Sequence, residues 1–127
     1  QARELNMNYP TYSVTIDQNR IDESKGSIDG WIYLSSFTPN EEFSNRYLER
    51  FGKEAQIASD SAYDAVKILA QAIEDTKSTD PNVLKEYLNN LVEYTGVSGK
   101  LVADGEGGFT KNYIVYRVIE GKSQLME

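Results

Sequence analysis

Residues 30–52 read GWIYLSSFTPNEEFSNRYLERFG and place a short strand directly before a helix. The apolar run at 30–35 is bounded by turn residues, which predicts a strand buried on both faces, as in a parallel sheet. Residues 38–41 (TPNE) match the pattern of a capping box, which predicts Thr38 as the N-cap of a helix with proline at its first position. Apolar side chains then recur at helical spacing until Gly52, which ends the helix. A buried strand that leads into an amphipathic helix is typical of an α/β protein.

The flanking sequence continues the mixture of strands and helices. The expected order is α, β, short α, β, α, α, α, β, β, with elements near 1–7, 9–16, 17–27, 30–35, 38–52, 59–76, 80–91, 99–103 and 112–119. Asp80 precedes Pro81 and is the expected N-cap of the third long helix. The longest helix, 59–76, has an apolar stripe that we expect to be buried, formed by Ala62, Ala65, Val66, Leu69 and Ile73.

Composition excludes several classes of function. The 127 residues contain no cysteine and no histidine, which removes thiol nucleophiles, disulfides, Cys/His zinc sites and imidazole acid–base chemistry. The net charge of -7 leaves no basic stripe for phosphates, so we expect no nucleic-acid partner. No apolar run approaches the roughly 18 residues of a membrane span. No motif for a metal or another cofactor is present, and we expect none.

Carboxylates are the abundant reactive groups, and two arrangements of them stand out. Asp60 and Asp64 lie one helical turn apart, which fits either a pair that binds a cation or ligand amine, or favourable charge at a helix N-terminus. Residues 104–108 (DGEGG) offer too few oxygen ligands for a calcium loop, so a hairpin turn is predicted. The serines lack a histidine or lysine in any catalytic motif, and we therefore expect no enzyme activity.

Several segments, taken in order, resemble one family. They are residues 1–5 (QAREL), 29–34 (DGWIYL), 43–52, 61–66 (SAYDAV), 79–91, 96–99 (GVSG), 103–107 and 113–118. The family is the branched-chain amino-acid type of periplasmic binding protein, which has the type I fold and serves ABC transporters. The resemblance covers nearly the whole chain, although the segment 17–27 is shorter and more charged than usual. Since the family is far longer, we expect the chain to be the C-terminal portion of such a protein.

The resemblance implies a two-lobed receptor that closes on a solute, with the chain crossing between lobes. Residues 1–34 and 109–127 would belong to the second lobe, and 36–103 to the first. The implied function is extracytoplasmic binding of a small polar solute, an amino acid or similar, for delivery to the membrane permease of an ABC transporter. The alternative is the ligand-sensing ectodomain of a signalling receptor with the same fold.

Further expectations follow for location and assembly. The resemblance implies a periplasmic or extracellular protein, with a lipid anchor as one way of attachment through a missing N-terminus. Exposed apolar surface on the first-lobe segment would favour a homodimer of this chain. Alone, with half of the cleft absent, the 127 residues are expected to bind solute weakly or not at all.

The family takes its ligand contacts from loops at the carboxyl ends of strands and from helix N-termini. In amino-acid binders an acidic residue often stands near the position of Thr15, whereas here the nearest acid is Asp17, so the identity of the solute stays open. Each residue carried over could equally serve an ordinary loop or cap. The candidate ligand-binding residues are Ser13, Thr15, Asp17, Phe37, Ala58, Ser59 and Asp60.

Overall fold

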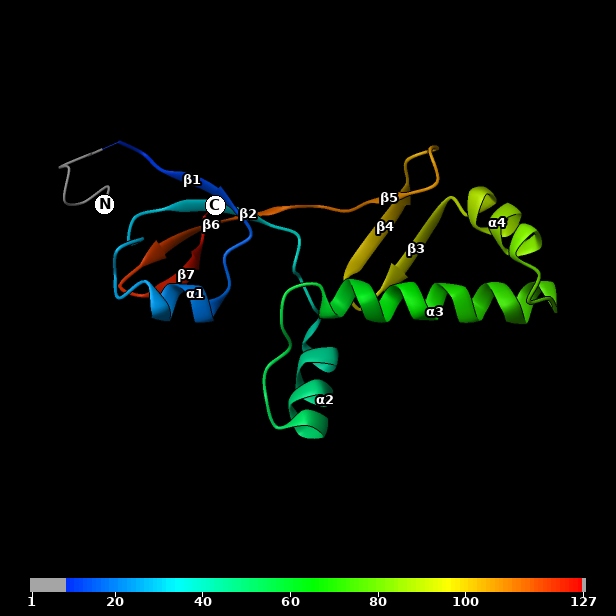
Figure 1. Cartoon of the computed structure of the whole chain (residues 1–127), viewed down its shortest axis with the longest axis horizontal. Helices are drawn as coiled ribbons and strands as arrows, with labels where there is room; N and C mark the ends of the chain where they lie inside the picture. The colour runs from blue at the N-terminus through cyan, green and yellow to red at the C-terminus, as the bar shows by residue number, and fades with distance from the viewer. Residues whose placement is uncertain (1–8, 127) are drawn as a thin grey trace. The chain divides into compact units, whose positions relative to one another are not determined.

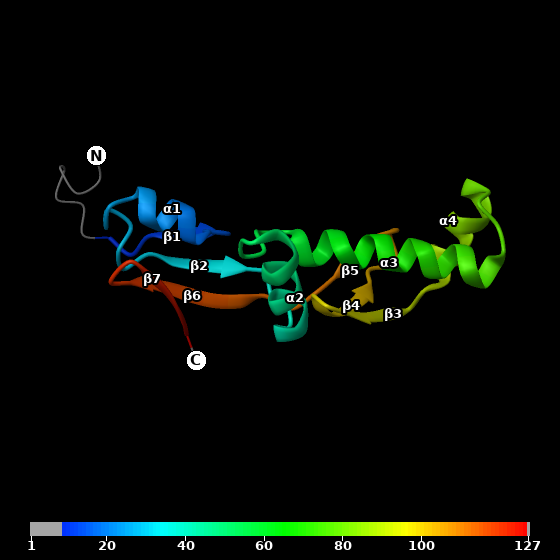
Figure 2. The same cartoon turned by 90° about the horizontal axis from the view of Figure 1, so that it is seen from below.

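The chain folds into two compact units, each with its own sheet. The structure is a computed structural model and describes residues 9–126, so the helix end expected at 1–7 lies outside the described residues. The first unit contains the chain up to residue 36 and from 113 onward, and the second contains 37–112. Both units combine helices with strands, which confirms the predicted α/β class (Figures 1 and 2). No helix within 9–126 has the length and apolar character that a membrane crossing requires.

The described residues of the first unit form a four-stranded mixed sheet and one short helix. The strand order is β1-β2-β6-β7, in which β1 and β2 are parallel and the other neighbours are antiparallel. The elements are β1 (Tyr12–Val14), α1 (Gln18–Glu23), β2 (Ile32–Ser35), β6 (Ile114–Ile119) and β7 (Lys122–Leu125). The core of this unit is made by Ile16, Ile21, Tyr33 and Val118, with Trp31 and Tyr116 packed against it.

The prediction that the strand at 30–35 is buried on both faces is wrong. Within β2, Tyr33 is 4% exposed but Leu34 is 43% exposed, so one face of the strand is open. Alternate side chains of a strand point to opposite faces, and the core formed with Ile16, Ile21 and Val118 lies on the face of Tyr33. Strand β7 was not predicted from the sequence, and its four residues are all exposed.

The second unit contains three helices and a three-stranded antiparallel sheet of order β3-β4-β5. Its elements are α2 (Glu41–Phe51), α3 (Ser59–Thr76), α4 (Pro81–Asn90), β3 (Glu93–Gly96), β4 (Gly99–Ala103) and β5 (Phe109–Thr110). The long helix α3 runs beside this sheet in both views (Figures 1 and 2). The predicted limits of α3 and β4 are confirmed, whereas β3 and the two-residue β5 were not expected.

Capping of α2 differs from the prediction by two residues. The N-cap is Asn40, whose side chain accepts a hydrogen bond of 2.8 Å from the backbone N–H of Phe43. Pro39 therefore precedes the cap, and Thr38 is free to bond elsewhere in the unit. Gly52 ends the helix in the left-handed conformation, at φ 66°, as predicted. Asp80 caps α4 with Pro81 in its first turn, which is also confirmed.

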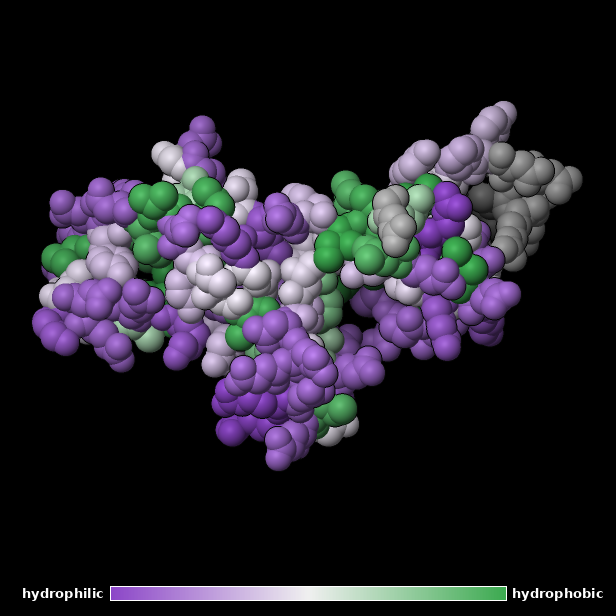
Figure 3. Space-filling view, turned by 180° about the vertical axis from the view of Figure 1, so that it is seen from behind, coloured by the Kyte–Doolittle hydropathy of each residue, from purple (hydrophilic) through white to green (hydrophobic). Residues whose placement is uncertain are grey.

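The expected buried stripe of α3 is wrong. The buried residues of this helix are Asp60, Asp64, Ile68 and Ala72, which follow one another at a spacing of four and so share one face. Val66 and Leu69, predicted to be buried, are 68% and 44% exposed. Hydrophobic residues accordingly reach the molecular surface among hydrophilic ones (Figure 3). A pattern of apolar residues could not reveal the buried face, because that face begins with two carboxylates.

A substitution at Ala58 tests the conformation at the start of α3. Ala58 is the N-cap at φ 69°, without a side-chain cap bond. Glycine adopts this conformation without steric cost and is a better N-cap than alanine, so Ala58→Gly should stabilise the natural-length protein by about 0.5–1 kcal/mol. The control Ala70→Gly, at an exposed position within α3, should destabilise it by about 1 kcal/mol. Urea unfolding followed by circular dichroism measures both, and equal losses would contradict the assigned backbone conformation.

Candidate functional site

A groove within the second unit is bounded by α2, the start of α3 and β3. Its cavity volume is about 940 Å³. Three aromatic rings of α2 line one wall, and Phe43 lies 5.4 Å from Tyr63 of α3, ring centre to ring centre. The lining residues are Asn40, Glu42, Phe43, Arg46, Tyr47, Arg50, Phe51, Ser59, Ala62, Tyr63, Asp64, Lys67, Tyr94, Thr95, Gly96 and Val97. From the sequence, the three rings of α2 were predicted only to form the apolar face of a helix.

Cations stand beside the aromatic wall of this groove. Arg46, Arg50 and Lys67 all line it, and the guanidinium of Arg46 lies 3.5 Å from the carboxylate of Glu42. On the opposite wall, burial raises the pKa of the Tyr94 hydroxyl, and the nearby charge of Asp64 adds to the effect. The lining thus combines aromatic rings with cationic side chains.

Asp64 holds the turn between β3 and β4. Its carboxylate is fully buried and accepts hydrogen bonds from the backbone N–H groups of Val97, at 2.9 Å, and Ser98, at 2.8 Å. A carboxylate that accepts two backbone N–H bonds can remain buried, because both oxygens are satisfied. Gly96 lies so close that an added Cβ would overlap the carboxylate of Asp64. The aspartate therefore serves the loop and is not open to a solute.

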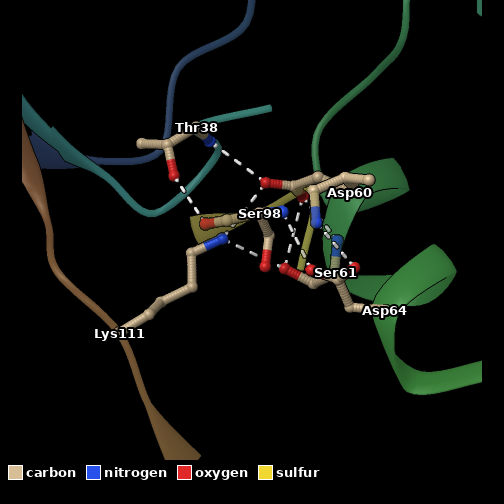
Figure 4. Close-up of polar contacts among 7 residues, drawn as sticks. Thr38, Asp60, Ser61, Asp64, Ser98 and Lys111 are labelled. Atoms are coloured by element: carbon tan, nitrogen blue, oxygen red, sulfur yellow. Dashed lines mark hydrogen bonds and ion pairs between the residues drawn. The ribbon is translucent and has the colours of Figure 1, made fainter. Parts of the chain in front are cut away.

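Asp60 has a different set of partners, drawn together in Figure 4. Its Oδ2 accepts bonds from the backbone N–H of Thr38 and from Nζ of Lys111, each at 3.1 Å. Its Oδ1 accepts from the backbone N–H of Ser61 at 2.7 Å. Asp60 is fully buried, and the side chain of Lys111 is only 11% exposed. The amine beside this carboxylate thus belongs to the chain itself. No sequence pattern predicts a contact between two residues that are 51 positions apart.

The candidate residues of the first unit follow one another from β1 to α1. Ser13 lies within β1 and Thr15 directly follows that strand. Thr15 has φ 49°, which is unfavourable for a β-branched residue, and its N–H donates to the carbonyl of Leu34 at 2.8 Å. Asp17 caps α1 by accepting a bond of 2.8 Å from the N–H of Arg20. The structure thus places all three at the carboxyl end of a parallel strand.

The candidate residues of the second unit lie at the start of α3 and at the start of the unit itself. Ala58, Ser59 and Asp60 are consecutive, and Ser59 also lines the groove. The Ser59 hydroxyl accepts a bond of 3.1 Å from the N–H of Gln56, which is a cap-like role. Phe37 is half-buried. Asp60 has no exposed surface with which to meet a solute, so its direct contact stays a prediction that the geometry does not favour.

The turn at 104–108 connects β4 and β5 and confirms the predicted hairpin. Asp104 accepts hydrogen bonds from the N–H groups of Glu106 and Gly108, at 2.8 and 2.9 Å. These two bonds lower the pKa of the Asp104 carboxyl below its usual value. Within residues 9–126 no group of three or more acidic, histidine or cysteine side chains is placed to hold a metal ion.

The sequence matches the family model described as periplasmic binding protein over residues 1–123. The chain belongs to this family. The resemblance noted from the sequence segments is thereby confirmed, and the family implies a periplasmic or extracellular location. Among curated proteins, none matches the chain.

Solved structures of periplasmic binding proteins share the fold. A leucine-binding protein, LivK, from Thermotoga maritima has a TM-score of 0.85 at 24% identity, and the match covers 99% of this chain and 39% of that one. An ABC transporter substrate-binding protein from Desulfitobacterium hafniense in complex with Leu has a TM-score of 0.81 at 21% identity, over 98% and 38%. The branched-chain amino acid transporter substrate-binding protein LivJ from Streptococcus pneumoniae, in complex with isoleucine, has a TM-score of 0.79 at 17% identity. This match covers 98% of this chain and 39% of that one.

The chain therefore spans 38–39% of the length of these three binding proteins. At such identities the likeness shows the fold, which is the type I fold of periplasmic binding proteins. The candidate residues of this family member lie in two groups. Ser13, Thr15 and Asp17 belong to the first unit, and Phe37 and residues 58–60 belong to the second.

A double-mutant cycle tests the role of Asp64 in this family member. Gly96→Ala should destabilise the natural-length protein by about 3 kcal/mol, because the new methyl group displaces the buried carboxylate. Asp64→Ala should cost a similar amount, since the N–H groups of Val97 and Ser98 lose their acceptor. With Asp64 already removed, Gly96→Ala should cost much less. Urea unfolding of all four proteins measures the cycle, and strictly additive losses would show that the two residues do not interact.

Proposed function

We propose that this chain takes part in binding a small polar solute, an amino acid or similar, for delivery to the permease of an ABC transporter. The observation that carries the proposal is the family match, which extends over residues 1–123. Two of the three solved relatives described above are complexes with leucine or isoleucine. Since this chain spans only 38–39% of their length, the solute and the permease are proposals for it.

The first unit supports the proposal through the backbone at Thr15. Ligands of α/β sheets bind at the carboxyl ends of parallel strands, and Thr15 follows such a strand. A β-branched residue at φ 49° costs free energy, and strained residues of this kind cluster at binding and active sites. Ser13 and Asp17 flank it on the same segment. We propose that Thr15 and Ser13 offer hydroxyl groups to the solute, with Asp17 near its amine.

The second unit supports the proposed solute binding through the N-terminus of α3. The N-terminus of this 18-residue helix is the positive end of its dipole, where a carboxylate is favoured. Ser59 stands in the first turn of α3, with Ala58 before it. We propose that Ser59 and Ala58 face the acidic end of the solute and that Phe37 contacts its apolar part.

The organisation into lobes is part of the same proposal. We assign residues 1–34 and 109–127 to the second lobe of the receptor and 36–103 to the first. The chain changes unit at 36/37 and at 112/113, which is compatible with connections in those regions. In this assignment the protein has no catalytic role, in keeping with a family described as binding proteins.

Attachment and self-association are secondary proposals. A lipid anchor would keep the receptor near its permease. A homodimer of this chain is supported by the apolar side chains exposed on α3, of which Val66 is 68% exposed. If that surface drives association, Val66→Ser should abolish the dimer in sedimentation equilibrium, whereas Thr79→Ala should not alter it. A monomeric wild-type chain would remove this proposal.

Calorimetric titration of the natural-length protein tests solute binding. Leucine, isoleucine, valine and a set of small polar solutes are titrated in turn, and at least one is expected to bind in the micromolar range or tighter. The chain of residues 1–127 alone should bind weakly or not at all. Thr15→Ala and Ser59→Ala should each weaken binding about tenfold, the equivalent of one lost hydrogen bond of about 1.4 kcal/mol.

The control for these variants is Thr79→Ala, an exposed threonine in the turn before α4. It should leave the affinity unchanged. The proposal is contradicted if no solute binds the natural-length protein. The assignment of the site, as distinct from the function, is contradicted if a solute binds and neither Thr15→Ala nor Ser59→Ala weakens it.

A further inference from the structure

Both ends of the second unit are bonded to the same side chain. The chain enters this unit at residue 37 and leaves it after 112, so Thr38 is the second residue of the unit and Lys111 is the last but one. Although they are far apart in sequence, both bond to Asp60 at the start of α3. The two stretches that connect this unit to the rest of the chain therefore meet at one carboxylate (Figure 4).

The geometry makes the two bonds interdependent. The N–H of Thr38 and Nζ of Lys111 each lie 3.1 Å from the same oxygen, Oδ2 of Asp60. The other oxygen, Oδ1, is occupied by the N–H of Ser61, whose hydroxyl also accepts a bond of 3.2 Å from Lys111. Asp60 cannot turn toward one partner without loss of another. A change at Asp60 must therefore reach both connecting stretches.

Burial makes this arrangement hard to replace by another. Asp60 has no exposed surface, and the Lys111 side chain is 11% exposed, so water cannot readily stand in for either partner. Loss of one member of a buried ion pair leaves a charge without compensation, which is far more costly than the loss of an exposed pair. The exposed pair in the same unit, Lys100 with Glu93, has side chains that are 56% and 55% exposed. The two pairs thus provide a matched comparison.

A second contact fixes the incoming stretch. The hydroxyl of Thr38 donates to the carbonyl of Ser98 at 3.1 Å, and the N–H of Ser98 donates to Asp64 at 2.8 Å. Residue 38 is thus bonded both to α3 and to the turn between β3 and β4. The outgoing stretch has Lys111 as its anchor on Asp60 and Ser61.

We propose that Asp60 is a positioning residue that holds both connecting stretches against the start of α3, so that the freely moving part of each connection lies outside Thr38 and Lys111. It acts on solute binding through these stretches and not by contact with the solute. The effect on affinity rests on the proposed solute-binding function, whereas the anchoring of the two stretches does not. Asp60 was predicted from the sequence to contact the ligand, whereas here it positions the two connecting stretches.

Hydrogen exchange of the natural-length protein tests the anchoring. Asp60→Asn keeps the size of the side chain but removes its charge and one acceptor oxygen. Exchange of the Thr38 amide, and of a peptide covering residues 109–113, should become at least about tenfold faster in this variant. The double variant Asp60→Asn with Lys111→Met should show the same faster exchange in both regions, and it leaves no unpaired buried charge. The matched control Lys100→Met should leave both regions unchanged.

The pattern of exchange decides between positioning and a general loss of stability. The inference holds if the two connecting stretches exchange faster while the amides in the middle of α3 and in β4 keep their protection. It is overturned if Thr38 is unaffected in both Asp60 variants, if only one stretch responds, or if α3 and β4 lose protection to the same extent.

Calorimetry with the solute that the natural-length protein binds tests the effect on affinity. The double variant should bind about 2- to 30-fold more weakly, because looser connections must be ordered on binding. An unchanged affinity together with faster exchange would overturn the link to binding. Absence of any solute binding in the wild type would contradict the proposed function, and the exchange result would still decide the role of Asp60.

Discussion

Two buried carboxylates, one helical turn apart on α3, determine how the second unit is arranged. Asp64 satisfies two backbone N–H groups in the turn between β3 and β4, and Asp60 satisfies Thr38 and Lys111. A carboxylate without exposed surface is stable only with all its partners in place, so these bonds fix the loops around α3. The helix contributes a rigid spacing of four residues, and Gly96 provides the room that Asp64 needs.

The same constraint connects fold to function. The start of α3 is where polar groups gather in this unit: the candidate contacts Ala58 and Ser59 precede the buried Asp60 directly. The Asp60 carboxylate accepts a bond from the N–H of Ser61 and pairs with Lys111, so its charge is compensated within the chain. The family match supports the proposed function. The buried network explains how this chain keeps the start of α3 in position.

Much of the fold could be predicted because it depends on local signals. The glycine after α2 and the Asp-Pro pair before α4 mark helix ends, and DGEGG at 104–108 marks a hairpin. The buried face of α3 could not be predicted, since apolar periodicity favours Val66 and Leu69 over a face that begins with aspartates. The partnership of Lys111 with Asp60 is a long-range contact that no spacing rule reveals. Thr15 looked like an ordinary strand residue, and only its φ of 49° marks it as unusual.

A crystal structure of the natural-length protein, solved with and without its solute, tests the central claim most directly. The account predicts that Oδ2 of Asp60 lies within hydrogen-bond distance of the Thr38 N–H and the Lys111 amine in both states. It also predicts that the bound solute touches neither Asp60 nor Asp64. A structure in which the Asp60 carboxylate faces the solute, or in which Lys111 is turned to solvent, would contradict it.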